Sequence, residues 1–186
     1  AYEIPKRDWS SDVCSSDLSS ISITSVATET KHQERIVGIH FFNPAQIMKL
    51  VEIVKSAFTS QETVSRSIEF IRSIHKVPVV TKDTPGFIVN RIARPFYGEA
   101  LRLLGEGVAT IEEIDRIVKL EGGFKMGPFE LMDLIGIDVN FAVTQSMYEQ
   151  YFNEPRYRPH ITQKQMVESN RLGKKTGRGF YKYENK

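Results

Sequence analysis

The chain has 186 residues, of which 40% are hydrophobic and 26% are charged, as is typical of a globular protein. Its formal net charge of +2 is close to neutral and indicates neither a nucleic-acid partner nor an anionic membrane surface. A single cysteine, Cys14, excludes an intrachain disulfide and a cysteine-based metal site, and no apolar run approaches membrane-spanning length. We therefore expect no metal, no nucleic acid and no membrane partner. A cytoplasmic location is the default, although an organelle matrix fits the same features.

Residues 1–18 differ in character from the rest of the chain. They contain the near-repeat Ser-Ser-Asp-Val-Cys and Ser-Ser-Asp-Leu, with neither a helical nor a strand period. Clusters of serine and aspartate of this kind are typical of loops and disordered segments. We predict an unstructured or artefactual segment here and exclude it from the fold prediction.

The next part of the chain alternates between expected helices and strands. Residues 22–34 can form a short helix. The β-branched run at residues 36–39 predicts a buried parallel strand that ends near His40, because Asn43-Pro44 favours a turn. The apolar run at residues 50–54 predicts a second strand, which carries Glu52 in its middle.

A helix and a third strand follow. Thr59 and Glu62 have the spacing of a capping box, which predicts a helix start. The helix has apolar residues at close to the 3.6-residue period, namely Val64, Ile68, Ile71 and Ile74. Residues 77–80 predict another strand. Strands that alternate with amphipathic helices indicate a parallel α/β sheet in residues 19–84.

Beyond Pro85 the pattern predicts helices only. The first expected helix spans residues 87–104, with a kink at Pro95. A capping box of Thr110 and Glu113 opens the second. The third begins at Gly127-Pro128 and continues, with a bend at Gly136, to Phe152, and the last spans residues 161–170. Residues 85–186 are therefore expected to form an all-α domain.

His40 and Glu52 form the most informative pair of polar residues. A glutamate inside a buried strand is costly unless it is paired, and His40 is its nearest plausible partner in sequence. An imidazole held by a carboxylate is the arrangement that a general base needs. The alternative from the residues alone is a histidine satisfied within the core, which is the more common situation.

Several longer motifs identify a family. They occur in order along the chain as residues 19–24 (SSISIT), 40–44 (HFFNP), 48–52 (MKLVE), 83–91 (DTPGFIVNR), 127–133 (GPFELMD) and 175–181 (KTGRGFY). Together they resemble the 3-hydroxyacyl-CoA dehydrogenases of the 3-hydroxybutyryl-CoA dehydrogenase type. The resemblance covers the chain from Ser19 almost to its last residue.

The resemblance implies the C-terminal part of a Rossmann-like NAD-binding domain followed by a helical, 6-phosphogluconate-dehydrogenase-like C-terminal domain. The sequence departs from the family in its N-terminal part. It contains no Gly-x-Gly-x-x-Gly motif, and Asp17-Leu18 stands where the family has Asn-Thr before its paired serines. We therefore expect a family sequence that begins at Ser19, without the part that grips the dinucleotide.

The resemblance also implies site residues. His40 would take the proton of the substrate 3-hydroxyl, and Glu52 would orient His40 and stabilise its imidazolium. Ser19 would hydrogen-bond the reacting oxygen, Asn90 would join the same polar network or contact the substrate carbonyl, and Asn43 would lie near the cofactor. The alternatives are a helix N-cap for Ser19, an interhelical hydrogen bond for Asn90 and ordinary turn chemistry for Asn43.

The expected function is oxidation of an L-3-hydroxyacyl-CoA, for example 3-hydroxybutyryl-CoA, to a 3-oxoacyl-CoA by NAD. The expected partners are the acyl-CoA substrate and a second copy of the chain, bound through the helical domain. The chain alone is expected to be inactive. The alternatives are a non-catalytic structural or dimerisation fragment and a segment of a multifunctional β-oxidation protein. The sequence leaves open the acyl-chain length and the choice between NAD and NADP.

Overall fold

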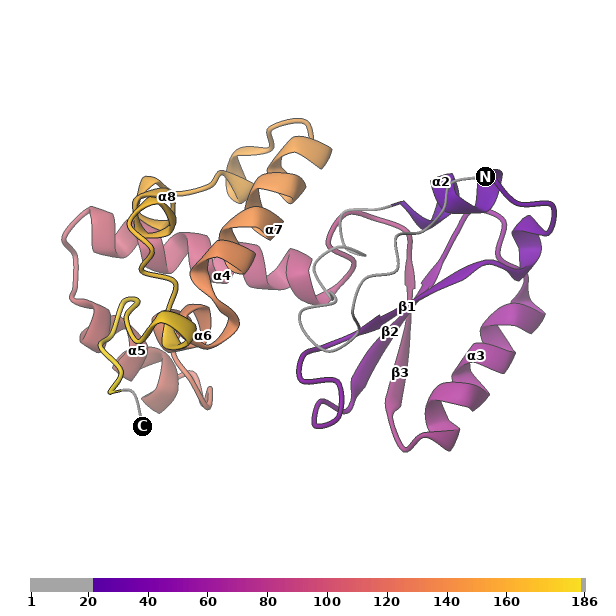
Figure 1. Ribbon diagram of the computed structural model, residues 1–186, viewed down its shortest axis with the longest axis horizontal. Helices are drawn as coiled ribbons and strands as arrows, with labels where there is room; N and C mark the ends of the chain where they lie inside the picture. Colours follow the sequence, from indigo (N-terminus) through magenta and orange to yellow (C-terminus); the bar gives the residue numbers. More distant parts are fainter. Residues whose placement is uncertain (1–21, 185–186) are drawn as a thin grey trace. The chain divides into compact units, whose positions relative to one another are not determined.

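The computed structural model describes residues 22–184, so the segment predicted at residues 1–18 lies outside the described residues. The chain divides into two compact units between Thr84 and Pro85, and each unit is described by itself (Figure 1). The first contains the sheet, and the described part of the second contains helices and short turns without a named strand. An α/β region followed by an all-α region is confirmed.

The sheet of the first unit has three strands in the order β1 (Val37–Phe41), β2 (Leu50–Lys55) and β3 (Val77–Lys82). Strands β2 and β3 are parallel, as predicted. The prediction of a parallel strand ending at His40 was wrong, because β1 runs antiparallel to β2. The short connection at residues 42–49 returns the chain directly beside β1, whereas a parallel pair needs a longer crossover.

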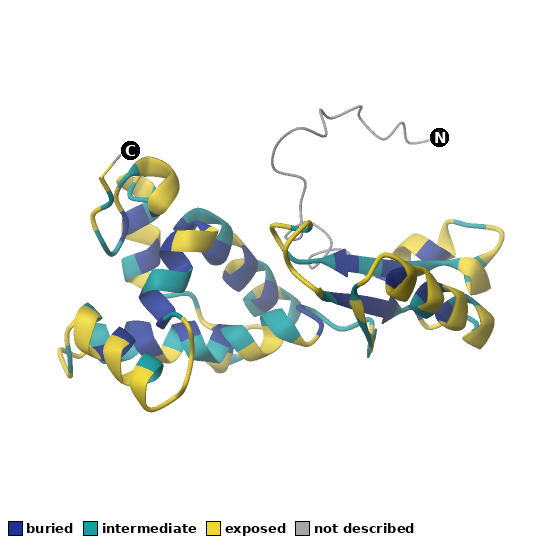
Figure 2. Ribbon diagram, turned by 90° about the horizontal axis from the view of Figure 1, so that it is seen from below, coloured by how far each residue is buried: buried dark blue, intermediate teal, exposed yellow. Residues whose placement is uncertain are grey.

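Two helices accompany this sheet. Helix α3 (Gln61–Ser73) provides the crossover from β2 to β3 (Figure 1). Buried residues lie both on the strands and on the helices beside them (Figure 2). Ile71 of α3 is buried in a cluster with Val51 and Ile53. Its N-cap is Ser60, whose hydroxyl accepts a hydrogen bond from the Thr63 amide. The predicted capping box of Thr59 and Glu62 was therefore wrong, since the Thr59 hydroxyl instead donates to the Ile36 carbonyl at 2.6 Å.

The helix expected at residues 22–34 is shorter in the structure. Helix α2 spans Ile23–Thr28, and a 3-10 helix at Gln33–Arg35 follows it. The Ser22 hydroxyl caps α2 by accepting from the Ser25 amide. Ile23 and Ala27 are buried, and they hold this short helix on the first unit.

The described helices of the second unit are α4 (Val89–Gly105), α5 (Ile111–Leu120), α6 (Pro128–Ile135), α7 (Ile137–Gln150) and α8 (Ile161–Glu168). The capping box of Thr110 and Glu113 is present, and Pro128 opens α6 as expected. The single bent helix expected through Gly136 is instead two helices. Gly136 has φ +103°, which a right-handed helix cannot accommodate.

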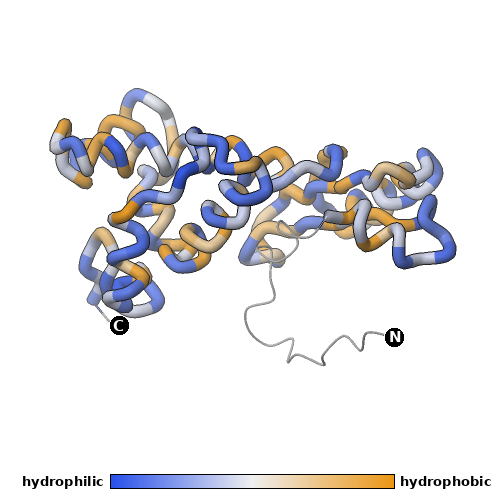
Figure 3. Tube along the Cα trace, turned by 90° about the horizontal axis from the view of Figure 1, so that it is seen from above, coloured by the Kyte–Doolittle hydropathy of each residue, from blue (hydrophilic) through white to orange (hydrophobic). Residues whose placement is uncertain are grey.

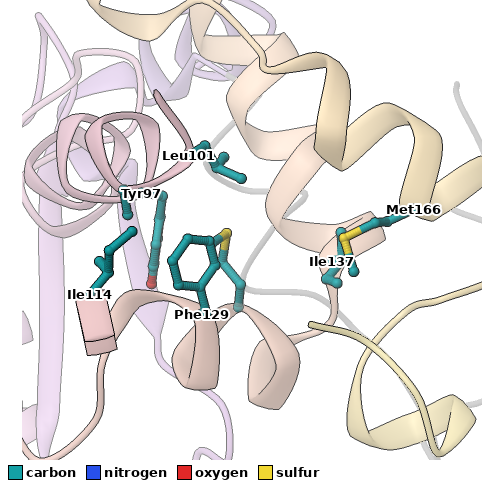
Figure 4. Packing of buried hydrophobic residues seen from close by; sticks show 8 residues of the cluster. Tyr97, Leu101, Ile114, Phe129, Ile137 and Met166 are labelled. Atoms are coloured by element: carbon teal, nitrogen blue, oxygen red, sulfur yellow. The ribbon is translucent and has the colours of Figure 1, made fainter. Parts of the chain in front are cut away.

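The core of the second unit joins side chains from all five of these helices. Figure 4 shows this cluster, which includes Tyr97, Leu101, Ile114, Phe129, Ile137 and Met166. Hydrophobic and hydrophilic residues alternate along the helices that enclose it (Figure 3). Phe129 and Ile137 are completely buried. Among the described helices none is long and apolar enough to cross a membrane.

Candidate active site

The structure brings His40 and Glu52 together inside the first unit. His40 on β1 lies directly opposite Glu52 on β2 in the antiparallel register, so both side chains project from the same face of the sheet. His40 Nδ1 lies 2.8 Å from Glu52 Oε2, and each side chain is 1% exposed. The hairpin that was not foreseen is what places the two residues at one register position.

The hydrogen bond determines what the imidazole can do. A carboxylate accepts the Nδ1 proton, so the tautomer with the lone pair on Nε2 is favoured. The Phe42 ring packs edge-on against the imidazole, with centroids 4.8 Å apart. The ring orientation is therefore set by a carboxylate and by an aromatic neighbour. Such a pair can accept a proton on Nε2 and hold the resulting positive charge next to Glu52.

The loop after β1 carries the predicted cofactor residue Asn43. Asn43 is exposed and precedes Pro44 through a cis peptide bond. The Lys76 ammonium reaches this loop from beyond α3 and donates to the carbonyls of Ala45, at 2.5 Å, and Met48, at 2.9 Å. Sequence reasoning missed Lys76, since carbonyl groups leave no charge pattern to detect. Lys76 therefore holds in place the loop that carries Asn43.

Two further residues, Asn90 and Ser19, were predicted for this site. Asn90 is half-buried in the first turn of α4 and belongs to the second unit. Ser19 lies outside the described residues. The catalytic roles of Asn90 and Ser19 stay predictions.

Two buried carboxylates of the second unit were also missed. Asp133 accepts hydrogen bonds from the amides of Phe180 and Tyr181 and from the Tyr183 hydroxyl, each at 2.9 Å. Asp115 accepts from the amides of Phe129 and Glu130 and from the Tyr181 hydroxyl. These contacts attach residues 180–183 to the helices, which indicates a structural role for both carboxylates.

The two tyrosines in this network are donors only. Burial and the hydrogen bond to Asp115 raise the pKa of Tyr181 far above its ordinary value of 10.0. Burial and Asp133 raise the pKa of Tyr183 in the same way. Burial also raises the pKa of Asp115 from 3.8, although three hydrogen bonds oppose the shift. The phenols of Tyr181 and Tyr183 therefore stay protonated and act as hydrogen-bond donors to the two carboxylates.

Comparison with known proteins assigns the chain to a family. Residues 86–183 match the family model described as 3-hydroxyacyl-CoA dehydrogenase, C-terminal domain, and residues 10–84 match the NAD-binding domain of the same family. The chain belongs to the 3-hydroxyacyl-CoA dehydrogenase family. The family identified from the sequence motifs is thereby confirmed, and the cofactor of the family is NAD.

Individual relatives agree with this assignment. The chain is 52% identical over 165 residues to 3-hydroxyadipyl-CoA dehydrogenase of Escherichia coli, covering 89% of this chain and 35% of the relative. It is 45% identical over 172 residues to the human mitochondrial hydroxyacyl-coenzyme A dehydrogenase, covering 92% and 55%. The crystal structure of (S)-3-hydroxybutyryl-CoA dehydrogenase from Ralstonia eutropha superimposes with a TM-score of 0.85 at 43% identity, covering 90% of this chain and 59% of that one.

The chain spans between a third and three fifths of the length of these relatives. Its residues do not fit the whole of NAD. The pyrophosphate of a dinucleotide is bound by a glycine-rich turn at a helix N-terminus, and the 186-residue sequence contains no Gly-x-Gly-x-x-Gly. The glycine-rich turn that binds a pyrophosphate is therefore not among these residues.

Proposed function

We propose that this chain forms the proton-transfer and helical part of an NAD-dependent enzyme that oxidises L-3-hydroxyacyl-CoA, such as 3-hydroxybutyryl-CoA, to 3-oxoacyl-CoA. The observation that carries this proposal is the buried pair of His40 and Glu52, 2.8 Å apart near the C-terminal end of β1. An alcohol oxidation needs a base at the hydroxyl, and this pair supplies one.

In the proposed mechanism, His40 Nε2 takes the proton of the 3-hydroxyl. Glu52 keeps the imidazole in the accepting tautomer and stabilises the imidazolium that forms. NAD, when bound by the complete protein, would supply the acceptor for the hydride of C3, so that the C3–O bond becomes a carbonyl. Ser19 and Asn90 are assigned to hydrogen bonds with the reacting oxygen and the substrate carbonyl, and Asn43 to the cofactor side. One such donor is typically worth about 3 kcal/mol in the transition state.

The proposal includes a homodimer formed through the helical unit. Helices α4 and α6 and the turn after α7 present large apolar side chains to solvent, among them Ile92 at 69%, Leu134 at 51% and Phe152 at 93% exposure. Exposed apolar residues in this number favour an interface. Sedimentation that showed only monomer at micromolar concentration would contradict this part. The cytoplasmic location stays a prediction, and cell fractionation tests it.

Two other functions remain as alternatives. The chain could serve as a non-catalytic dimerisation element of the same fold, or as a segment of a multifunctional β-oxidation protein. The second alternative has one supporting observation, namely that the matched region makes up only 35% of the Escherichia coli relative. A full-length protein with a further enzymatic domain would support it.

The decisive test restores a dinucleotide-binding half. A dinucleotide-binding half that contains a Gly-x-Gly-x-x-Gly motif is joined in front of Ser19, and the chimera is assayed with acetoacetyl-CoA and NADH. We expect the chimera to consume NADH and the 186-residue chain alone to consume none. A chimera that binds NADH and acetoacetyl-CoA but shows no turnover would support the non-catalytic alternative.

A further inference from the structure

Helix α4 of the second unit buries a positive charge that pairs with no carboxylate of the described residues. The Arg94 side chain is 4% exposed, and its Nη1 donates to the Asn140 carbonyl at 2.8 Å and to the Thr144 hydroxyl at 3.0 Å. Both acceptors are neutral. No acidic group of the described chain lies within 4 Å of the guanidinium. A buried charge without a counter-charge is costly, which makes an anionic partner favourable.

The Arg94 guanidinium makes its hydrogen bonds to the described residues through one of its three nitrogens. Both hydrogen bonds of the guanidinium come from Nη1, whereas Nε is enclosed without an acceptor in the described chain. Nε and Nη2 form the side-on fork of the guanidinium, whose two parallel N–H groups match the two oxygens of a carboxylate. The ring of Tyr97 lies 5.0 Å from the guanidinium carbon and stabilises the charge without using this fork.

A second unpartnered donor belongs to the same pair of helices. Asn140 Nδ2 on α7 is buried without an acceptor in the described residues. The orientation of this amide is fixed, because its Oδ1 accepts a hydrogen bond from Gln163 Nε2 at 2.8 Å. Two buried donors on α4 and α7 therefore lack acceptors, and an anion with several lone pairs can satisfy such groups.

Arg94 is also correctly spaced from the proposed substrate contact. It follows Asn90 by four residues on α4, so the two side chains lie on the same helix face with Cβ atoms about 6 Å apart. Asn90 is the residue assigned above to the reacting end of the acyl group. Three C–C bonds beyond C3 extend about 4 Å along the acyl chain. A carboxylate at that distance from C3 comes within hydrogen-bonding reach of a guanidinium one helical turn from Asn90.

We propose that Arg94 binds the terminal carboxylate of a dicarboxylic 3-hydroxyacyl-CoA. The inference rests on the proposed function and names its substrate class, an acyl chain of about six carbons with a carboxylate at the end far from the thioester. Burial lowers the pKa of Arg94 to about 10, which leaves the guanidinium charged at neutral pH. The fork therefore supplies a permanent counter-charge for the second carboxyl group.

A pair of matched substrates tests this proposal in the chimera. 3-Hydroxyadipyl-CoA and 3-hydroxyhexanoyl-CoA both have six acyl carbons and differ in a terminal carboxylate against a terminal methyl group. We expect kcat/KM to favour 3-hydroxyadipyl-CoA by about 10- to 100-fold, because a methyl group leaves the buried fork unpartnered. Equal values for the two substrates would show that Arg94 holds only water and would overturn the inference while leaving the proposed function intact.

Variants of Arg94 assign the preference to this residue. Arg94→Met should reduce the ratio of the two kcat/KM values to near one, and Arg94→Lys should give an intermediate ratio, since an ammonium lacks the fork. Arg102→Met is the matched control, because Arg102 lies on α4 but is 38% exposed and pairs with Glu99; its ratio should stay as in the parent. If Arg94→Met fails to fold, as judged by circular dichroism, Arg94→Lys carries the test. If Arg94→Lys then has the same ratio of kcat/KM values as the parent, the inference is overturned. A chimera that is inactive on both substrates would overturn the inference together with the proposed function.

Discussion

The two units bury carboxylates in different ways. In the first unit Glu52 pairs with the His40 imidazole, a side chain that can act as a general base. In the second unit Asp133 accepts hydrogen bonds from two backbone amides and one phenol, which keep their protons. All of these carboxylates are almost completely inaccessible. The identity of the partner, rather than burial, therefore separates a group suited to catalysis from one suited to structure.

Glycine residues reinforce the structural carboxylates. A Cβ atom at Gly179 would overlap the Asp133 carboxylate, and a Cβ atom at Gly127 would overlap Asp115. The backbone thus approaches each carboxylate more closely than any other residue type allows. The motifs at residues 127–133 and 175–181 are therefore in contact. Hydrogen bonds to the Asp133 carboxylate join α6 to the last described residues.

The first prediction tests the titratable pair and has the largest expected effect. In the chimera, His40→Ala should lower the rate by about two to four orders of magnitude, the usual range for a lost general base. Glu52→Gln should also be slow, because an amide cannot stabilise the imidazolium and can favour the wrong tautomer. Steady-state kinetics with acetoacetyl-CoA and NADH measures both variants.

The double variant shows whether the two residues act as a unit. If they do, His40→Ala combined with Glu52→Gln is little slower than the slower single variant. Asp133→Asn serves as the control for a buried carboxylate of the structural kind, and its folded fraction should retain turnover. Near-normal turnover of Glu52→Gln would assign Glu52 to the same structural class as Asp133.

The second prediction concerns stability. Asp133→Asn places an amide donor against N–H and O–H donors, so we expect the free energy of unfolding of the second unit to fall by about 3 kcal/mol. Glu168→Gln is the control, because Glu168 is 62% exposed and forms only a surface ion pair with Lys164, worth less than about 0.5 kcal/mol. Urea unfolding of the 186-residue chain, followed by circular dichroism, measures both. Equal midpoints for the two variants would contradict the structural role of Asp133.

Sequence reasoning succeeded where a signal is local and periodic. The apolar runs located β2 and β3, and the Thr110 and Glu113 spacing located the start of α5. It also proposed His40 and Glu52 as partners, because a lone glutamate in an apolar run requires one. The reversal of β1 was missed, since a β-branched run looks the same in either direction. Arg94 was missed for a related reason, because its contacts on α7 lie some fifty residues away in the chain.

The third prediction uses acid to separate the two units. Asp83 in the first unit accepts hydrogen bonds from the Thr24 amide at 2.7 Å and the Ser22 hydroxyl at 2.8 Å. Burial alone would raise the pKa of Asp83, but these hydrogen bonds outweigh it and hold the pKa below 3.8. Asp115 in the second unit has the opposite shift, because burial raises its pKa above 3.8.

The signs of these shifts predict different responses to pH. A depressed folded-state pKa means that Asp83 stabilises the first unit above the unfolded pKa of 3.8, and that this contribution disappears as the pH falls through the folded value. A raised pKa means that protonation of Asp115 on acidification stabilises the second unit relative to neutral pH. Asp83→Asn should therefore make the stability of the first unit less dependent on pH between about pH 5 and pH 2, an effect of at most about 1 kcal/mol at this partly exposed site.

Thermal unfolding across that pH range measures how steeply stability depends on pH. Glu69→Gln is the control, because Glu69 is an exposed carboxylate on α3. If the stability of Asp83→Asn depends on pH as steeply as that of the parent, the contacts of Asp83 with the start of α2 contribute nothing to the acid response. The difference between the buried carboxylates of the two units would then rest on His40 and Glu52 alone.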